Sequence, residues 1–197
     1  LGGPLIEAEL PFGLEGSRRF VELLGRELGC EAKARSFVDS ELDAVAPRLE
    51  WSVPHAFAHR RFAFAGDPHY AEAFAGMIEE VGGRLVATVV MGRTGHLSPE
   101  RLRILEARPG TVFEPDRARL RRLFGATTRW EVDLLVCNSR SLKYLNPKIP
   151  WLEFGFPSEF THFLDDAPFL GFRGALSFLS RMANEVVKGL RMKAGAA

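Results

Sequence analysis

The feature that most constrains the fold of this chain is the alternation of short apolar runs with amphipathic stretches across residues 59–193. The clearest run, Leu85–Met91 (LVATVVM), is rich in β-branched residues and apolar on both faces. Strands of this kind are typical of parallel sheets whose two faces are both covered by helices. The pattern therefore predicts an α/β fold, with a parallel sheet of about five strands and helices on both faces.

Helix signals between the apolar runs agree with this prediction. Asp67 and Pro68 follow the first run at the N-cap and first position of a helix, where each residue type is favoured. Gly82 and Gly83 then stop that helix. We expect strands at 61–65, 85–91, 111–113, 132–136 and 149–154, and helices that begin at 68, 99, 117 and 171. The arrangement is Rossmann-like and chelatase-like.

Residues 1–58 lack apolar runs of this kind and are expected to be helical. Ser17 is placed to cap a first helix that ends near Leu28, and Ser36 to cap a second. Pro47 is expected to kink or end the second helix early. We therefore expect two parts: residues 1–58 as a helical lead-in that packs on a neighbouring domain, and residues 59–197 as a Rossmann-like C-terminal domain.

Composition excludes several classes of protein. Among 197 residues, Lys and Arg number 26 and Asp and Glu 25, so no global field draws the chain to nucleic acid or to a membrane. No apolar window approaches the length of a transmembrane helix, and Leu1–Leu10 has no basic segment typical of a signal peptide. We expect a cytoplasmic protein. Because the sequence does not begin with Met, we also expect a processed or excised piece.

The chain offers few metal ligands. Two cysteines, Cys30 and Cys137, rule out a disulfide scaffold and a four-thiolate zinc or iron–sulfur site built by one chain. The histidines are not spaced to place two ligands on one helical face. We therefore expect no metal ligand among the five, which are His55, His59, His69, His96 and His162.

Ligands of parallel sheets bind beyond the carboxyl ends of the strands. This directs attention to the turns that begin at Gly66, Gly92, Cys137 and Gly155. The first turn has one glycine where a dinucleotide site needs three, which argues against NAD or FAD. Asp67 is interpreted first as a helix cap and second as part of a pocket or interface.

Two other features have an ordinary explanation that we prefer. Cys137 is interpreted as a small buried hydrophobe rather than as a thiol beside a cofactor cavity. The arginines of the stretch 117–124 spread around a helix as on a solvated face, and no interleaved aromatic residues favour nucleic-acid binding.

Five segments together resemble nitrogenase component 1, and most closely its beta-type chains and the related cofactor-assembly scaffold chains. The segments are PFGLEG (11–16), FAFAGDPHY (62–70), DLLVCNS (133–139), IPWLEFGFP (149–157) and PFLGFRGAL (168–176). They occur in the order of the family and at similar spacing. The resemblance implies a C-terminal domain together with the helical stretch that precedes it.

The resemblance also implies a function. It indicates a nitrogenase-like oxidoreductase in which this domain builds a subunit interface and one wall of the cofactor or substrate cavity. The wall residues would be Gly66, Asp67, Asn138, Ser139 and Phe156. The region of the family's cofactor histidine reads LEFGFPSEFTHF, where His162 is no match, so no metal ligand and no catalytic residue are assigned.

The implied partners are a second component 1 subunit, in a hetero- or homo-oligomer, and an ATP-driven iron–sulfur reductase that supplies electrons. The iron–sulfur cluster belongs to the full-length complex, and the domain alone is expected to be inactive. True nitrogenase, an assembly scaffold and a tetrapyrrole reductase all remain open as the parent. The alternative is a stand-alone carrier of a small ligand or a metallocofactor.

Overall fold

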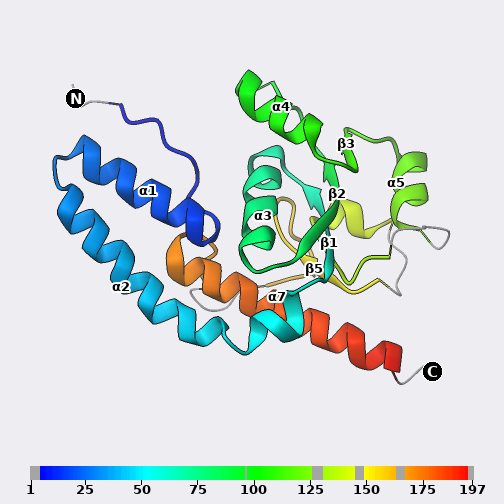
Figure 1. Ribbon diagram of the computed structural model, residues 1–197. Helices are drawn as coiled ribbons and strands as arrows, with labels where there is room; N and C mark the ends of the chain where they lie inside the picture. The colour runs from blue at the N-terminus through cyan, green and yellow to red at the C-terminus, as the bar shows by residue number, and fades with distance from the viewer. Residues whose placement is uncertain (1–4, 96, 126–130, 145–148, 163–166, 195–197) are drawn as a thin grey trace.

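The computed structural model describes residues 5–95, 97–125, 131–144, 149–162 and 167–194. At its centre lies a five-stranded parallel sheet in the order β3-β2-β1-β4-β5 (Figure 1). The strands are β1 (Arg61–Gly66), β2 (Arg84–Val90), β3 (Thr111–Phe113), β4 (Leu134–Cys137) and β5 (Trp151–Glu153). The predicted α/β class and its parallel sheet are confirmed.

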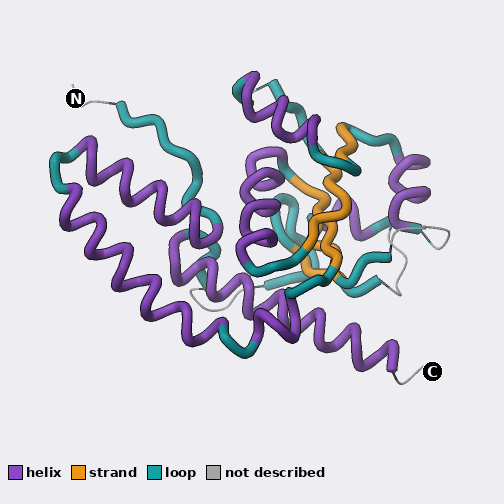
Figure 2. Tube along the Cα trace, in the orientation of Figure 1, coloured by secondary structure: helices purple, strands orange, loops and turns teal. Residues whose placement is uncertain are grey.

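Helices surround this sheet (Figure 2). They are α1 (Gly13–Glu27), α2 (Glu31–Leu49), α3 (Pro68–Glu80), α4 (Pro99–Ala107), α5 (Arg117–Phe124), α6 (Ser139–Leu142) and α7 (Gly171–Ala194), with a π-helical turn, η1, at Val53–Phe57. Among the described helices, none is both long and apolar enough to cross a membrane.

The central strand shows why helices pack on both faces. Side chains alternate along a strand, so Phe62 and Phe64 of β1 point to one face and the small Ala63 and Ala65 to the other. All four are buried. On the phenylalanine face, the ring of Phe64 lies 5.0 Å from that of Phe74 in α3, centroid to centroid.

Each face has its own buried cluster. The phenylalanine face packs against α3 and α7, which contribute residues such as Ile78 and Leu179. The alanine face packs against α5 through Leu120 and Phe124. Because α5 buries these apolar side chains, its arginines are left exposed. The solvated-face interpretation of that helix is therefore confirmed.

The first helix begins one turn earlier than predicted. Ser17 does not cap it but lies within it, buried, and its hydroxyl donates to the carbonyl of Gly13 at 2.5 Å. The N-terminal amides of α1 are satisfied instead by Glu80 of α3, whose carboxylate accepts from Leu14 at 3.0 Å and Glu15 at 3.1 Å. A local sequence pattern does not reveal a cap supplied from another helix.

The second helix also begins before its predicted start. It runs from Glu31 to Leu49, so Ser36 lies inside it. Pro47 falls in its last turn and the helix ends at Leu49, two residues later. A proline this close to the end disrupts little of the helix, because few turns follow it.

Phe12 fastens the lead-in to the sheet domain. It is 2% exposed, and its ring lies 5.5–5.7 Å from those of Tyr70, Phe154 and Phe178. One face of the α1–α2 pair therefore packs on α3 and α7 of the same chain (Figure 1). Packing of the lead-in on a further domain stays a prediction.

Candidate functional site

Four of the five predicted wall residues meet at one edge of the sheet. The strand order reverses between β1 and β4, and such a switch point opens a crevice at the carboxyl ends. Gly66 ends β1, and Asn138 and Ser139 follow β4 directly. The backbone N–H of Asn138 donates to the carbonyl of Ala65 at 3.1 Å, which holds the two strand ends together.

Asp67 has a local role. Its carboxylate accepts the backbone N–H of His69 at 2.9 Å, as the N-cap of α3. The sequence interpretation of Asp67 as a helix cap is therefore confirmed. A carboxylate oxygen that caps a helix is bound to the first turn, which limits its freedom to hold a ligand.

Asn138 joins the end of β4 to the loop after β5. Its side-chain oxygen caps α6 by accepting from the backbone N–H of Ser141 at 3.2 Å and from the Ser141 hydroxyl at 3.1 Å. Its amide nitrogen donates to the carbonyl of Phe156 at 3.2 Å. Asn138 thus brings Phe156 to the switch point through the backbone of that residue.

Ser139 is buried and bridges the same two segments. Its hydroxyl donates to the carboxylate of Glu153, at the end of β5, and accepts the backbone N–H of Glu159 at 2.7 Å. Its own backbone N–H donates to the carbonyl of Pro157 at 3.0 Å. The polar atoms of Asn138 and Ser139 are therefore used to hold the loop.

Two titratable groups at this edge have displaced pKa values. Burial raises the pKa of Glu153, but hydrogen bonds from Ser139, Thr161 and the amides of Glu159 and Phe160 outweigh it and lower that pKa to about 2. Burial raises the pKa of the Cys137 thiol, and the negative charge of Glu153 raises it further. Cys137 is fully buried, as expected of a small apolar residue.

The Phe156 side chain points away from the network that holds its backbone. It is 87% exposed, and Phe160, four residues later, is 57% exposed. Large apolar side chains that are held in water by an ordered loop mark a surface suited to contact with another molecule.

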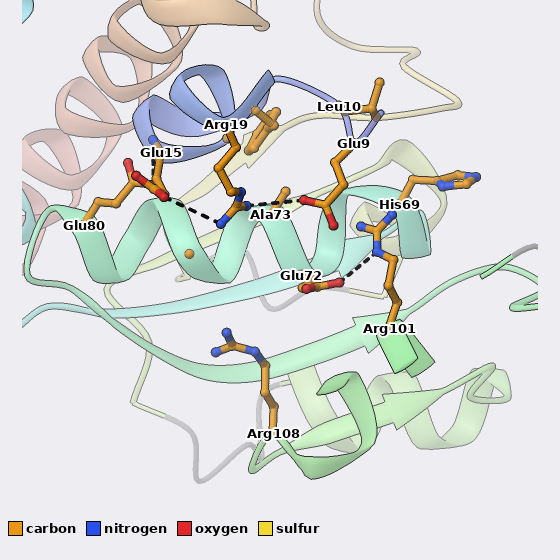
Figure 3. Close-up of a pocket in the computed structure, with 13 residues that line it drawn as sticks. Glu9, Leu10, Glu15, Arg19, His69, Glu72, Ala73, Glu80, Arg101 and Arg108 are labelled. Carbon is orange, nitrogen blue, oxygen red and sulfur yellow. Dashed lines mark hydrogen bonds and ion pairs between the residues drawn. The ribbon is translucent and has the colours of Figure 1, made fainter. Parts of the chain in front are cut away.

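A separate cavity of about 150 Å³ lies between the lead-in, α1, α3 and α4 (Figure 3). None of the predicted wall residues lines it. In Figure 3, Arg19 lies between Glu9 and Glu15, with nitrogen–oxygen distances of 3.4 and 3.9 Å. These charges are already paired.

The arginines on the lower side of the same cavity in Figure 3 also form ion pairs. Arg101 of α4 reaches Glu72 of α3 at 2.9 Å (Figure 3). Arg108, which follows α4, reaches Glu79 of α3 at 2.6 Å. Because each guanidinium that lines the cavity has a carboxylate partner, the cavity is best explained as an ion-paired contact between helices.

The described residues offer few side chains that could together bind a metal ion. In those ranges, no three side chains of His, Cys, Asp or Glu come close enough to hold a metal ion. Of the five histidines, His96 lies outside the described residues.

Glu153 was missed by the sequence analysis. Its signal is an acid inside the apolar run WLEFGF, where a carboxylate is buried only if donors meet it. Arg181 of α7 was also missed, and it donates to the backbone carbonyl of Glu153 at 3.3 Å. The donors to Glu153 come from other segments, so the sequence pattern alone does not show them.

Comparison with known proteins gives consistent matches. The model of the family "Nitrogenase component 1 type Oxidoreductase" matches residues 1–187. The chain is 29% identical, over 189 residues, to the nitrogenase molybdenum-iron protein beta chain of Frankia alni, covering 91% of this chain and 34% of that one.

Solved structures share the fold. A structure of nitrogenase Cp1 at pH 6.5 superposes with a TM-score of 0.76 at 19% identity, over 93% of this chain and 40% of that chain. A structure of nitrogenase Cp1 at pH 5 gives 0.65 at 9% identity, over 89% and 40%. The chain therefore spans about a third of the curated relative and 40% of the solved chains. Since the family model covers nearly the whole sequence, this chain belongs to the nitrogenase component 1 type oxidoreductase family.

Proposed function

We propose that this chain acts as the C-terminal domain of a nitrogenase component 1-type oxidoreductase and is not catalytic alone. In this role it supplies a subunit interface and part of the wall of a cofactor or substrate cavity. The wall is the sheet edge formed by Gly66, Asp67, Asn138, Ser139 and Phe156. The parent complex would be a cytoplasmic enzyme that receives electrons from an ATP-driven iron–sulfur reductase.

One observation carries the proposal. The polar groups of Asp67, Asn138 and Ser139 bind other parts of the chain, while the Phe156 ring stands 87% exposed beside them. The polar atoms of this edge already have hydrogen-bond partners, and the group that projects from it is aromatic. The edge can therefore contact a ligand or another part of the complex through its shape and its apolar surface. It offers no general base or nucleophile within the described residues, which fits a wall or an interface.

The donor set of the chain does not fit an iron–sulfur cluster of its own. Such clusters are held by cysteine thiolates, and the sequence holds only Cys30 and Cys137. Cys137 is buried, and burial raises the pKa of its thiol, which disfavours the thiolate. A cluster in the parent complex would therefore depend on ligands from other segments or another subunit.

The test is purification of the tagged chain, at its natural length, from its native cells. We expect a second nitrogenase component 1-type chain to co-purify, identified by mass spectrometry, together with iron. A Phe156→Ser variant, altered at the proposed cavity wall, should lower the activity of that complex at least tenfold while the second chain still co-purifies. Met192→Ser is the matched control, because Met192 is 71% exposed near the end of α7, where the helix passes Pro150 just before β5 and so lies at the other end of that strand from Phe156.

A different outcome of the same purification would contradict the proposal. A chain that is only as long as this sequence, runs alone and binds a metallocofactor stoichiometrically would refute the proposal. That outcome would support the stand-alone carrier instead.

A further inference from the structure

Helix α1 buries little apolar surface of its own. The side chains of its buried residues are no larger than that of serine. These residues are Gly13, Gly16, Ser17 and Gly25. Between residues 5 and 30, the one large side chain that is buried belongs to Phe12, directly before the helix. Because an element with few buried apolar contacts separates from its neighbours at low cost in free energy, the attachment of α1 depends strongly on this ring.

The Phe12 ring fills a socket that consists of three aromatic residues from different elements. Its centroid lies 5.7 Å from that of Tyr70 in the first turn of α3, 5.6 Å from that of Phe154 directly after β5, and 5.5 Å from that of Phe178 in α7. Two of the socket residues, Tyr70 and Phe154, also contact each other, at 5.1 Å. The ring of Phe12 therefore supports the start of α3 and the end of β5 at the same time.

Hydrogen bonds hold the same end of α1. The carboxylate of Glu80 accepts two backbone N–H groups in the first turn of α1, at 3.0 and 3.1 Å. The carbonyl of Pro11 accepts the backbone N–H of Gly171, the first residue of α7, at 2.7 Å. Both contacts lie within three residues of Phe12 in sequence. The attachment of α1 to the sheet domain is thus concentrated where the helix begins.

The other end of α1 is suited to bending. Figure 1 shows α1 running away from the sheet to the turn that joins it to α2. Gly29 in this turn has a φ of 65°, and a Cβ added there would meet no atom within 4 Å. Glycine adopts many backbone conformations at little cost, and hinges often use small residues at the ends of elements. A hinge at Gly29 would therefore let α1 move while α2 stays in place.

Helix α2 has a firmer attachment than α1. It buries the larger side chains of Val38, Val45 and Leu49, which belong to the same apolar cluster as α3 and α7. The difference in buried side chains separates the two helices of the pair, although they lie side by side. Movement of the lead-in and α1 therefore does not require that α2 leave the sheet domain.

We propose that residues 5–27, the lead-in and α1, form a hinged strap that Phe12 holds closed. In the closed position, Phe12 supports Tyr70 and Phe154. In the open position, α1 turns about Gly29 and the Phe12 ring leaves its socket. The strap is a conformational device within this chain and goes beyond the proposed function.

Opening of the strap also acts on the sheet edge. Tyr70 follows Asp67 by three residues, and Phe154 precedes Phe156 by two. When Phe12 leaves the socket, both segments lose a buried neighbour, so the wall becomes looser. This consequence for a cavity wall rests on the proposed function, whereas the opening of the strap and its effect on Phe154 do not.

The test is native-state hydrogen exchange of the chain at its natural length, measured by mass spectrometry of peptides. The first set of peptides covers α1, Gly171 and Phe154, and the reference set covers β1 and β2. In the wild type, we expect the first set to share one opening equilibrium. That opening should be at least tenfold more populated than the opening that exposes the reference set.

Two matched variants distinguish opening of the strap from unfolding of the whole chain. Phe12→Leu should speed exchange of the first set at least tenfold. The control is Phe57→Leu, because Phe57 is fully buried and its ring stacks on Phe62, near the start of β1 and away from the sheet edge. Since Phe57 stays packed when the strap opens, this control should speed exchange of the reference set and leave the first set unchanged.

Glu80→Ala provides a further variant that does not disturb the socket. It removes the acceptor of two N–H groups of α1, so the first set should exchange several-fold faster. The same measurement therefore tests the strap even if Phe12→Leu folds poorly. Unchanged exchange of α1 in Glu80→Ala would contradict the proposal.

Two results of the exchange experiment would overturn the proposal. If Phe57→Leu speeds both sets equally, α1 opens only when the whole chain unfolds, and there is no strap. If the Phe154 peptide follows the reference set while α1 opens separately, the strap does not act on the sheet edge. Failure of the proposed function is seen independently, because then no second chain co-purifies while the exchange data still report the strap.

Discussion

The carboxylate of Glu80, near the end of α3, accepts the backbone N–H of Leu14 at 3.0 Å, at the start of α1. The two residues lie 66 positions apart. The first turn of a helix has N–H groups with no partner inside the helix, and one side chain of the sheet domain satisfies two of them. This contact, together with Phe12, fastens the lead-in to the sheet domain.

Glu80→Ala should therefore destabilise the chain. The variant leaves the amides of Leu14 and Glu15 without their acceptor, and loss of a helix cap costs about 1 kcal/mol. The measurement is the free energy of unfolding in urea. Glu106→Ala is the matched control, since Glu106 is an exposed glutamate of α4 with no ion pair in the part of the chain that the structure describes. A loss of equal size in both variants would contradict the capping role.

The stability of the same contact should depend on pH. Desolvation raises the pKa of Glu80 above its ordinary value of 4.5, although the amides of Glu15 and Leu14 oppose it. Glu80 thus holds its proton more tightly in the folded chain than in the unfolded one. The associated stabilisation is fully present below pH 4.5 and is lost as pH rises through the folded pKa.

Glu80→Gln isolates this effect, because glutamine does not titrate. As pH rises from 4 to 7, the free energy of unfolding of the wild type should decline relative to that of Glu80→Gln. Unfolding curves of both proteins at several pH values provide the measurement. A difference that is constant with pH, or that changes in the other direction, would show that the pKa of Glu80 is not raised.

Local patterns predicted the sheet domain well because its signals are local. The alternation of phenylalanine and alanine in β1 indicates which face of the sheet each side chain lies on. Asp67 and Pro68, two adjacent residues, indicate where α3 begins. Both patterns depend only on residues that are adjacent in sequence. The structure agrees with the prediction in β1 and at the start of α3.

The errors occur where a distant residue decides the local structure. Ser17 looks like a cap, yet the cap of α1 comes from Glu80, so the helix begins at Gly13. Glu153 looks like an odd acid in an apolar run, yet donors from a loop and from α6 explain it. Asn138 and Ser139 were predicted to lie at the sheet edge, and the hydrogen bonds that occupy them required the structure.

The two cysteines should differ sharply in reactivity. Cys137 is fully buried, and burial together with the charge of Glu153 raises the pKa of its thiol, whereas Cys30 is only half-buried at the start of α2. Because the thiolate is the reactive form, a maleimide at neutral pH should label one site per native chain. Mass spectrometry of peptides should find the label on Cys30. In Cys30→Ser the native chain should remain unlabelled until denaturant is added, and rapid labelling of Cys137 would show that the end of β4 opens.

Two helical glycines should respond oppositely to alanine. A Cβ on Gly25 of α1 would lie 2.5 Å from the Cβ of Ala34 in α2, so the helices would have to separate. Overpacking of this kind costs about 1–3 kcal/mol, which exceeds the gain of about 0.5–1 kcal/mol from replacing a helical glycine. A Cβ on Gly76 of α3 meets no atom within 4 Å. Gly25→Ala should therefore lower the free energy of unfolding, and Gly76→Ala should raise it by about 0.5–1 kcal/mol. Urea unfolding of the two variants beside the wild type decides the matter, and stabilisation by Gly25→Ala would contradict the close approach of α1 and α2.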